Sequence, residues 1–324
     1  MLNKSDLLFL ISWILLIRFS ASVIVQIPQP RSISKEEFHQ QICNFWTPEL
    51  FLAAEELTLE ISGLEKYPVI DSRQSTPSNS RIIPGGAPAN SSNSTNDTKP
   101  IQVIDYTATI GRVFWIVNVS SYSCSGSIVS SKTKSILSTA AHCLYDPVEK
   151  VYYTQHNWVF VPGYSNGTAP FGVWPATGFS ISDLWIDQGI FDGDAAFVSV
   201  SKLNGKHLQD VVGSQGIGFN LPRQSLVHAF GYPINIDNGR TLQRCVNYAS
   251  SYGLPSYLYN GQGIACNMTG GSSGGPRIQN MSSNGYGALT SVNSFYLENL
   301  PNVLFGPYFD SNTEMLYEAI DEAD

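Results

Sequence analysis

Residues 264–276 read IACNMTGGSSGGP, a pair of serines set among glycines. Glycine lets the backbone turn sharply, so that successive N–H groups can point into one space and hold a negatively charged oxygen. A serine hydroxyl is by itself a weak nucleophile, because it needs a histidine within hydrogen-bond reach and that histidine needs a carboxylate to fix its tautomer. The stretch therefore directs the search to a histidine and an acid elsewhere in the chain.

His142 is the best candidate for the base among the five histidines of the chain. It lies in STAAHC (138–143), directly after an apolar run and beside a cysteine. The remaining histidines fall in a helical leader, in polar stretches typical of a surface, or in structural positions: His39, His156, His207 and His228.

The acid comes from residues 183–200, DLWIDQGIFDGDAAFVSV. Asp194 directly precedes the apolar run AAFVSV, so its side chain can be buried beside the histidine. Three nearby acids compete and are otherwise interpreted as solvated loop residues: Asp183, Asp187 and Asp192.

Chain order then separates two fold classes. Gly270, Ser272 and Gly274 also match the G-x-S-x-G turn of α/β-hydrolases, but that fold needs its histidine after the serine and none follows His228. The order His142, Asp194, Ser273 is instead that of the chymotrypsin-like double β-barrel.

The motifs TAAHC, the aspartate before AAFV, and GSSGGP together resemble the trypsin-like, chymotrypsin-fold serine endopeptidases. Four further stretches are more similar to the secreted microbial branch related to glutamyl endopeptidases than to animal trypsins: CNMTGGSSGGP, FVPGY (160–164), AFGYP (229–233) and FGPYF (305–309). The resemblance covers about residues 101–318.

The resemblance implies a role for each candidate residue. His142 would be the general base, Asp194 its orienting acid and Ser273 the nucleophile that forms an acyl-enzyme, with the N–H groups of Gly271 and Ser273 as the oxyanion hole. It also implies the disulfides Cys124–Cys143 and Cys245–Cys266, which leaves Cys43 unpaired among the five cysteines.

The strand pattern agrees with an all-β fold of two six-stranded antiparallel barrels, a short C-terminal helix and a helical pro-region before the barrels. Short apolar or alternating runs are bounded by Gly, Pro, Asn and Ser at 110–119, 126–129, 135–137, 151–153, 158–161, 195–200, 225–230 and 287–292. The expected domains are a signal peptide (1–22), a pro-region with linker (23–100), an N-terminal barrel (101–205) and a C-terminal barrel with terminal helix (206–324).

Helices are expected at two places. Residues 31–66 have a helical composition, with Ser34 and Glu37 matching a capping box and Pro48 breaking or restarting the helix. Residues 313–323 form the expected terminal helix. Between them, residues 71–100 are rich in Ser, Asn, Pro and Gly and predict a linker.

The N-terminus has the pattern of a secretory signal. Lys4 precedes the apolar run Leu7–Ile17, and small residues follow, with cleavage expected near Ala21 or Ser22. The alternative is a membrane anchor, but the run is shorter than the roughly 20 residues that span a bilayer. Sequons for glycosylation agree with export to the extracellular space: Asn90, Asn93, Asn96, Asn118, Asn166, Asn267 and Asn280.

One feature departs from animal trypsins, and a second resembles them and conflicts with the first. Ser272 stands where they have an aspartate, so the buried ion pair with a new N-terminus cannot form. Residues 81–86, RIIPGG, nevertheless look like an activation site. We expect residues 23–81 to be a pro-region, released by cleavage in the 71–100 linker, whose helix covers the cleft or assists folding.

The specificity pocket is expected to be uncharged. Its candidate residues are of mixed polarity: Asn267, Met268, Thr290 and Asn293. Asn267 stands where trypsins carry an aspartate, and the histidine typical of glutamyl endopeptidases is missing. The sequence therefore predicts no strong preference for a charged substrate residue, and an unmodified Asn267.

Composition limits the partners. A net charge of −8 argues against nucleic acid, and no zinc-type spacing or HExxH motif indicates a metal or other cofactor. The expected partners are protein or peptide substrates of a monomer that is free of the membrane once mature. Two other functions use the same residues: a catalytically inactive protease homologue that acts as a secreted binding module, and an esterase.

Overall fold

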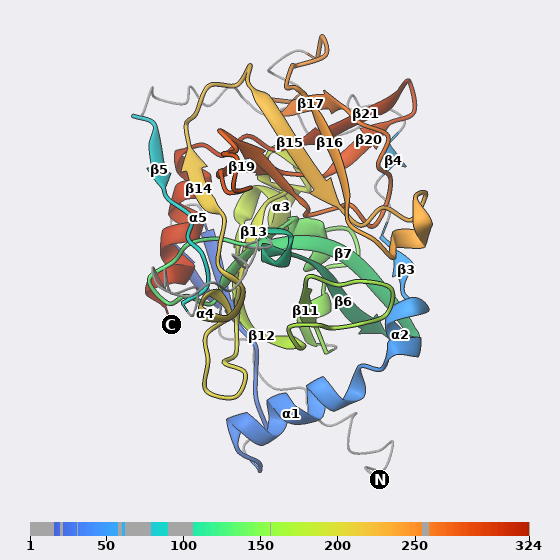
Figure 1. Cartoon of the computed structure of the whole chain (residues 1–324), viewed down its shortest axis with the longest axis vertical. Coiled ribbons are helices and arrows are strands. Elements are labelled where there is room, and N and C mark those ends of the chain that lie inside the picture. The colour runs from blue at the N-terminus through green and yellow to red at the C-terminus, as the bar shows by residue number, and fades with distance from the viewer. Residues whose placement is uncertain are drawn as a thin grey trace, which may run out of the picture.

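The computed structural model describes residues 16–19, 22–30, 32–57, 60–61, 79–89, 106–155, 157–254 and 259–323. The first half of the fold is a closed antiparallel barrel in the order β11-β6-β7-β8-β13-β12, closed because β12 pairs with both β11 and β13 (Figure 1). Its six strands are β6 (Ile110–Val117), β7 (Ser120–Ile128), β8 (Ile136–Thr139), β11 (Val159–Pro162), β12 (Trp174–Ser182) and β13 (Ala196–Val200). A short hairpin, β9 (Tyr145–Asp146) and β10 (Val151–Tyr152), lies beside it.

The second half divides its strands between two sheets, each of which also takes in a strand from the N-terminal region. The larger has the order β16-β15-β18-β19-β14-β5, from β5 (Arg81–Ile83), β14 (Gly216–Phe219), β15 (Leu226–Gly231), β16 (Gln243–Tyr248), β18 (Pro276–Gln279) and β19 (Ala288–Val292). The smaller has the order β17-β21-β20-β4, from β4 (Glu60–Ile61), β17 (Gln262–Ala265), β20 (Phe295–Leu297) and β21 (Leu300–Gly306). A bridge between Ser250 and Gly263 joins the two sheets.

Helix α5 (Ser311–Glu322) confirms the expected C-terminal helix and ties the chain end to the first barrel. The Asp310 side chain caps it by accepting from the N–H groups of Asn312 and Thr313. Tyr317 packs edge-on against Phe197 of β13, with ring centroids 5.5 Å apart. The all-β class with a terminal helix is therefore confirmed. Short helices α3 (Asp183–Gln188) and α4 (Leu208–Val212) cover the connections around β13.

Strand β2 (Ser22–Gln26) extends the barrel sheet by pairing antiparallel with β12. Val23, Ile24 and Val25 are almost fully buried and belong to the same apolar core as the barrel strands. Ser22, at the expected signal cleavage position, is the first residue of this strand, and β1 (Leu16–Phe19) pairs with it. The remainder of the expected signal peptide lies outside the described residues. No helix of the described chain is long and apolar enough to cross a membrane.

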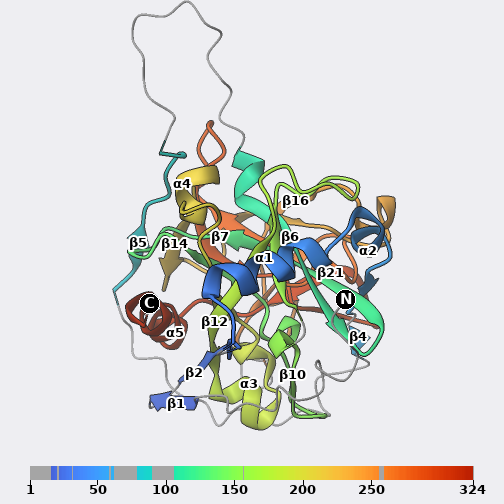
Figure 2. The ribbon, with the colours of Figure 1, turned by 90° about the horizontal axis from the view of Figure 1, so that it is seen from below.

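Two helices follow β2 and attach to the outside of the first barrel. Helix α1 (Lys35–Phe45) is capped by the Ser34 hydroxyl, which accepts from the Glu37 N–H at 3.1 Å, and α2 (Pro48–Leu52) begins at Pro48. Both expected signals are thus confirmed. Seen from below in Figure 2, α1 lies across the barrel in front of β12.

An aromatic anchor, formed by Trp46, Phe51, Phe114 and Tyr164, holds this region to the barrel. Trp46 stacks on Phe51 with centroids 5.4 Å apart, and Phe51 lies 4.6 Å from Phe114 of β6. Large buried aromatic side chains contribute strongly to such contacts.

The helical prediction for residues 31–66 is wrong at 55–56 and 60–61, whereas residues 58–59 and 62–66 lie outside the described residues. After α2 the chain forms two extended pieces, β3 (Glu55–Glu56), which pairs with β7, and β4, which pairs with β20. The available edges of β7 and β20 outweigh the modest helix propensity of this stretch. The expected linker is described only at 79–89, where β5 forms.

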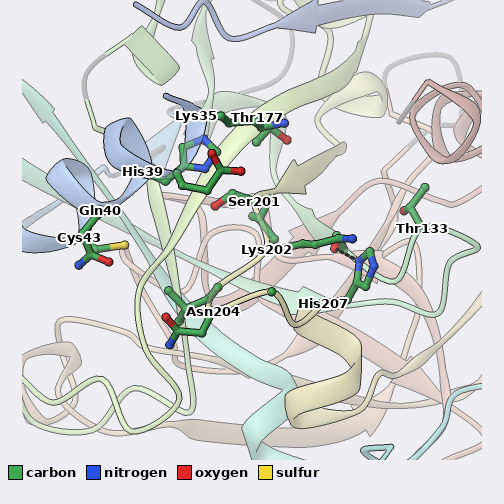
Figure 3. Close-up of a pocket in the computed structure, with 15 residues that line it drawn as sticks. Lys35, His39, Gln40, Cys43, Thr133, Thr177, Ser201, Lys202, Asn204 and His207 are labelled. Carbon is green, nitrogen blue, oxygen red and sulfur yellow. Dashed lines mark hydrogen bonds between the residues drawn. The ribbon is translucent and has the colours of Figure 1, made fainter. Parts of the chain in front are cut away.

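A cavity of about 580 Å³ separates one face of α1 from the loop after β13 (Figure 3). Lys35, His39 and Cys43 line it from the helix, and Lys202 and His207 line it from the loop. Cys43 is free; its Sγ donates to the Val173 carbonyl, and burial raises its pKa to about 11. The thiol therefore stays protonated and unreactive at neutral pH. None of the residues that line this cavity is a predicted catalytic residue.

Candidate active site

His142 lies in a tight 3-10 turn, Ala141–Cys143, directly after β8. The expected disulfides are confirmed, and Cys124–Cys143 fixes this turn to β7, while Cys245–Cys266 joins β16 to the segment after β17. The sulfur atoms of Cys124 and Cys143 and a ring nitrogen of His142 lie within 4.8 Å of one another. Sulfur atoms bonded to each other offer no thiolate, so this group does not form a metal site.

Asp194 holds His142 through both carboxylate oxygens. Its Oδ1 accepts from the His142 backbone N–H at 2.9 Å, and its Oδ2 lies 2.8 Å from His142 Nδ1. A third donor, the Ser294 hydroxyl, also reaches Oδ2. The carboxylate is completely buried, and it orients the imidazole so that Nε2 becomes the nitrogen available for proton transfer. Of the competing acids, Asp192 accepts from the Asn260 N–H instead.

The loop that carries Ser273 runs close to the residues that lead into His142, but the Ser273 hydroxyl makes no hydrogen bond to His142 Nε2 in the described chain. A Cβ on Gly274, which has φ of +77°, would lie 2.1 Å from Thr139 Oγ1 and 2.7 Å from the Ala140 nitrogen. The backbone after Ser273 therefore runs against the residues that lead into His142. From the other side, the Ser125 N–H of β7 donates to the Ser273 carbonyl at 2.7 Å.

The loop contains backbone N–H groups that are free to bind a reacting molecule. Gly271 has φ of +83°, and within the described chain neither its N–H nor that of Ser273 finds a hydrogen-bond acceptor. His142 Nε2 is likewise buried without a partner there. Two free backbone donors beside a serine and an imidazole nitrogen are what acyl transfer requires, because they can hold the oxygen that becomes negative.

Asn293 and Arg277 support the loop that carries Ser273. The Asn293 amide donates to the carbonyls of Phe230 and Ser272, and its Oδ1 accepts from Arg277 Nε at 3.0 Å. Arg277 is almost fully buried and also donates to backbone carbonyls of β17 and β21. Burial lowers its pKa to about 10.

The four expected pocket residues lie in different surroundings. Asn267 is exposed, whereas Met268 packs in an apolar cluster with Ile264 and Leu304. Thr290 is buried near the Arg277 carbonyl, and the Asn293 side chain is occupied by the hydrogen bonds described above. Exposure at Asn267 makes it the member of this group most open to a substrate side chain.

The structure also shows the contacts of Ser272 and of the activation-like stretch 81–86. The Ser272 hydroxyl is buried and donates to the Thr269 carbonyl at 2.6 Å. Where animal trypsins have an aspartate carboxylate, this chain therefore has a hydrogen bond within a local turn. Arg81 lies in β5, and its guanidinium contacts Glu314 and Glu318 of α5 at 2.6 and 2.5 Å. The activation-like stretch is therefore held in a strand.

Sequence reasoning missed the supporting residues Ser125, Arg277 and Ser294. Each acts through a partner more than 14 residues away in the chain. No local motif marks such contacts; Ser294, for example, is one of four serines in residues 282–294, and its neighbours do not distinguish it from the others.

Asp192 gives a pH-dependent prediction. Its carboxylate accepts from the Asn260 N–H at 2.9 Å, and burial raises its pKa to about 7 against the opposing effects of that hydrogen bond and of Arg223. The folded protein thus keeps a proton that the unfolded chain loses near pH 4, so the free energy of unfolding falls between pH 4 and 7, by roughly 4 kcal/mol for this group. Asp192→Asn removes this slope.

Urea unfolding of both proteins at pH 5 and pH 8 measures the effect. The variant should gain stability relative to the wild type as the pH rises. Parallel pH profiles would show that Asp192 titrates normally.

Two solved structures resemble the chain at 37% sequence identity. They are a thermostable serine protease, AL20, from an extremophilic microorganism, and the protease Anisep from Arthrobacter nicotinovorans, each with a TM-score of 0.61. Each match covers 67% of this chain, and 99% and 97% respectively of the other. A Glu endopeptidase bound to MPD shares the fold at 15% identity, with a TM-score of 0.54 over 68% of this chain and 93% of the other. No protein-family model and no curated protein matches the chain.

Proposed function

Since the chain belongs to the chymotrypsin-fold serine proteases related to glutamyl endopeptidases, we propose that it hydrolyses peptide bonds with Ser273 as nucleophile, His142 as general base and Asp194 as orienting acid. The observation that carries the proposal is the buried Asp194 carboxylate, which accepts from both the backbone and the ring of His142. An imidazole fixed in this way can take the Ser273 proton while the hydroxyl oxygen attacks the peptide carbonyl. The resulting acyl-enzyme is then hydrolysed by water.

The oxyanion is assigned to the N–H groups of Gly271 and Ser273. Support comes from the absence of acceptors for both donors in the described part of the chain and from the positive φ of Gly271. Removal of one such donor typically costs about 10²–10³-fold in rate.

We further propose that the protein is secreted with residues 23–100 as a pro-region. AL20 and Anisep are matched over nearly their whole length, yet about a third of this chain has no counterpart in either (100% − 67% = 33%). Two disulfides suit an oxidising compartment. The described sequon residues Asn118, Asn166 and Asn280 are exposed, as glycosylation requires.

Labelling with a fluorophosphonate, followed by peptide mapping, tests the function. The probe forms a covalent bond only with an activated serine, so it should attach to Ser273 and not to Ser272, and hydrolysis of a casein-derived peptide mixture should stop. A protein that stays unlabelled and leaves peptides intact would instead be an inactive homologue.

A further inference from the structure

The candidate site lies between two strand segments that each touch a catalytic residue. On one side is β7, whose Ser125 N–H donates to the Ser273 carbonyl. On the other is the segment that leads into β20, where the Ser294 hydroxyl donates to Asp194. An extended peptide that reached Ser273 would have to pass between these two walls.

The N-terminal region already occupies both walls. Glu56 of β3 pairs with Ser123, two residues before Ser125, and Glu60 of β4 pairs with Tyr296, two residues after Ser294. The Ser123 hydroxyl also donates to the Glu55 carbonyl at 3.2 Å.

Neither wall has a second edge to offer at these positions. Beside Ser123, β7 pairs with β6 on its other side, and β20 pairs with β21 on its other side. Because a strand has only two edges, another chain can pair there only after β3 and β4 have left.

Both pairings are parallel, which fixes the direction of the N-terminal segment. The segment passes from the β7 wall to the β20 wall, and only three residues, 57–59, separate β3 from β4 in the sequence. Four links of extended chain reach about 14 Å at most, so the two occupied edges are close together. A peptide antiparallel to the same walls would run in the opposite direction.

The residues just before β3 hold it against β7. The aromatic anchor ends at Phe51, four residues before β3, and the Ser121 hydroxyl of β7 donates to the Leu50 carbonyl at 3.2 Å. In Figure 1, β3 and β4 lie along the same side of the molecule, beside β7 and β20.

We propose that β3 and β4 are a built-in inhibitor that keeps the peptide-binding edges of β7 and β20 closed until the N-terminal region is displaced. The proposal rests on the proposed endopeptidase function and assigns the inhibition to these strands, whereas helix α1 packs against β12. The segment that contains β3 and β4 runs in the direction opposite to that of an antiparallel substrate. It therefore blocks the site without binding as a substrate does.

The test uses the intact, full-length chain, with its mass checked before each measurement. Proline has no N–H and is poorly tolerated in a paired strand, so Glu60→Pro with Ile61→Pro should open the β20 edge. Glu60→Ala with Ile61→Ala keeps both N–H groups and is the matched control. The rate of fluorophosphonate labelling at Ser273 should rise about tenfold in the proline variant and stay within about twofold in the control. Amide exchange at residues 295–297 should rise with it.

A second variant guards against misfolding. Trp46→Ala weakens the aromatic anchor away from both walls and should also raise the labelling rate. If the wild type labels as fast as both opened variants, the inhibitor proposal is overturned, while the proposed function stands. If Ser273 stays unlabelled in every variant with native amide protection of the first barrel, the proposed function fails and the inhibitor proposal fails with it.

Discussion

Replacing Ser273 with alanine is expected to lower kcat for peptide hydrolysis by roughly 10⁵–10⁶-fold. The substitution removes the attacking oxygen but leaves the free N–H groups of Gly271 and Ser273, the latter now on alanine, as well as the fold of the loop. KM should change little, because the hydroxyl acts only in the chemical step. The measurement is steady-state hydrolysis of a fluorogenic peptide, made with protein whose N-terminal region has been displaced.

Ser272 provides the matched control, since it is the neighbouring hydroxyl in the same loop. Its side chain donates to the Thr269 carbonyl and points away from the chemistry proposed here. Ser272→Ala should therefore retain activity within about tenfold. Loss of activity in this variant, together with retention in Ser273→Ala, would move the nucleophile to the preceding residue.

Replacing Asp194 with asparagine should lower kcat by about 10⁴-fold. The carboxylate accepts three hydrogen bonds, from the His142 backbone, the His142 ring and Ser294. An amide has one acceptor atom, so it can no longer serve all three donors, and its NH₂ group favours the wrong imidazole tautomer. Hydrolysis rates across a pH series, with circular dichroism as a check of the fold, measure the loss.

Asp187→Asn is the control for this substitution. Asp187 competes with Asp194 in the sequence, but its side chain is exposed at the end of α3. Activity should stay within about twofold. Equal losses in the two variants would show that the effect comes from general charge and not from orientation of His142.

The sequence predicts the first barrel better than the second half. Strands such as β6, β11 and β13 are apolar runs, and the structure has them within two residues of the predicted bounds. Strand β12 was not predicted, because WPATGFSIS mixes Pro, Gly and hydroxyl residues. All nine of its residues are nevertheless buried, since β2 and α5 cover it, and no local pattern indicates that cover.

The same distinction applies to the site. The pairing of His142 with Asp194 could be predicted because each stands in a recognisable motif. The role of Ser273 as nucleophile stays a prediction. The strands β3 and β4 could not be predicted, since they are short and exist only through partners at 122–123 and 296–297. Ser294 and Arg277 depend in the same way on distant strands.

Strand β2 affects how the two fragments behave after the linker is cleaved. Its three valine and isoleucine residues lie inside the apolar core, between β12 and α5, so severing the linker breaks the polypeptide without breaking this contact. A protein cleaved in the linker would remain a complex of two fragments, and their dissociation would expose apolar side chains on both. Maturation would then require dissociation of the N-terminal fragment as well as cleavage. Its rate would rise with temperature and with denaturant concentration.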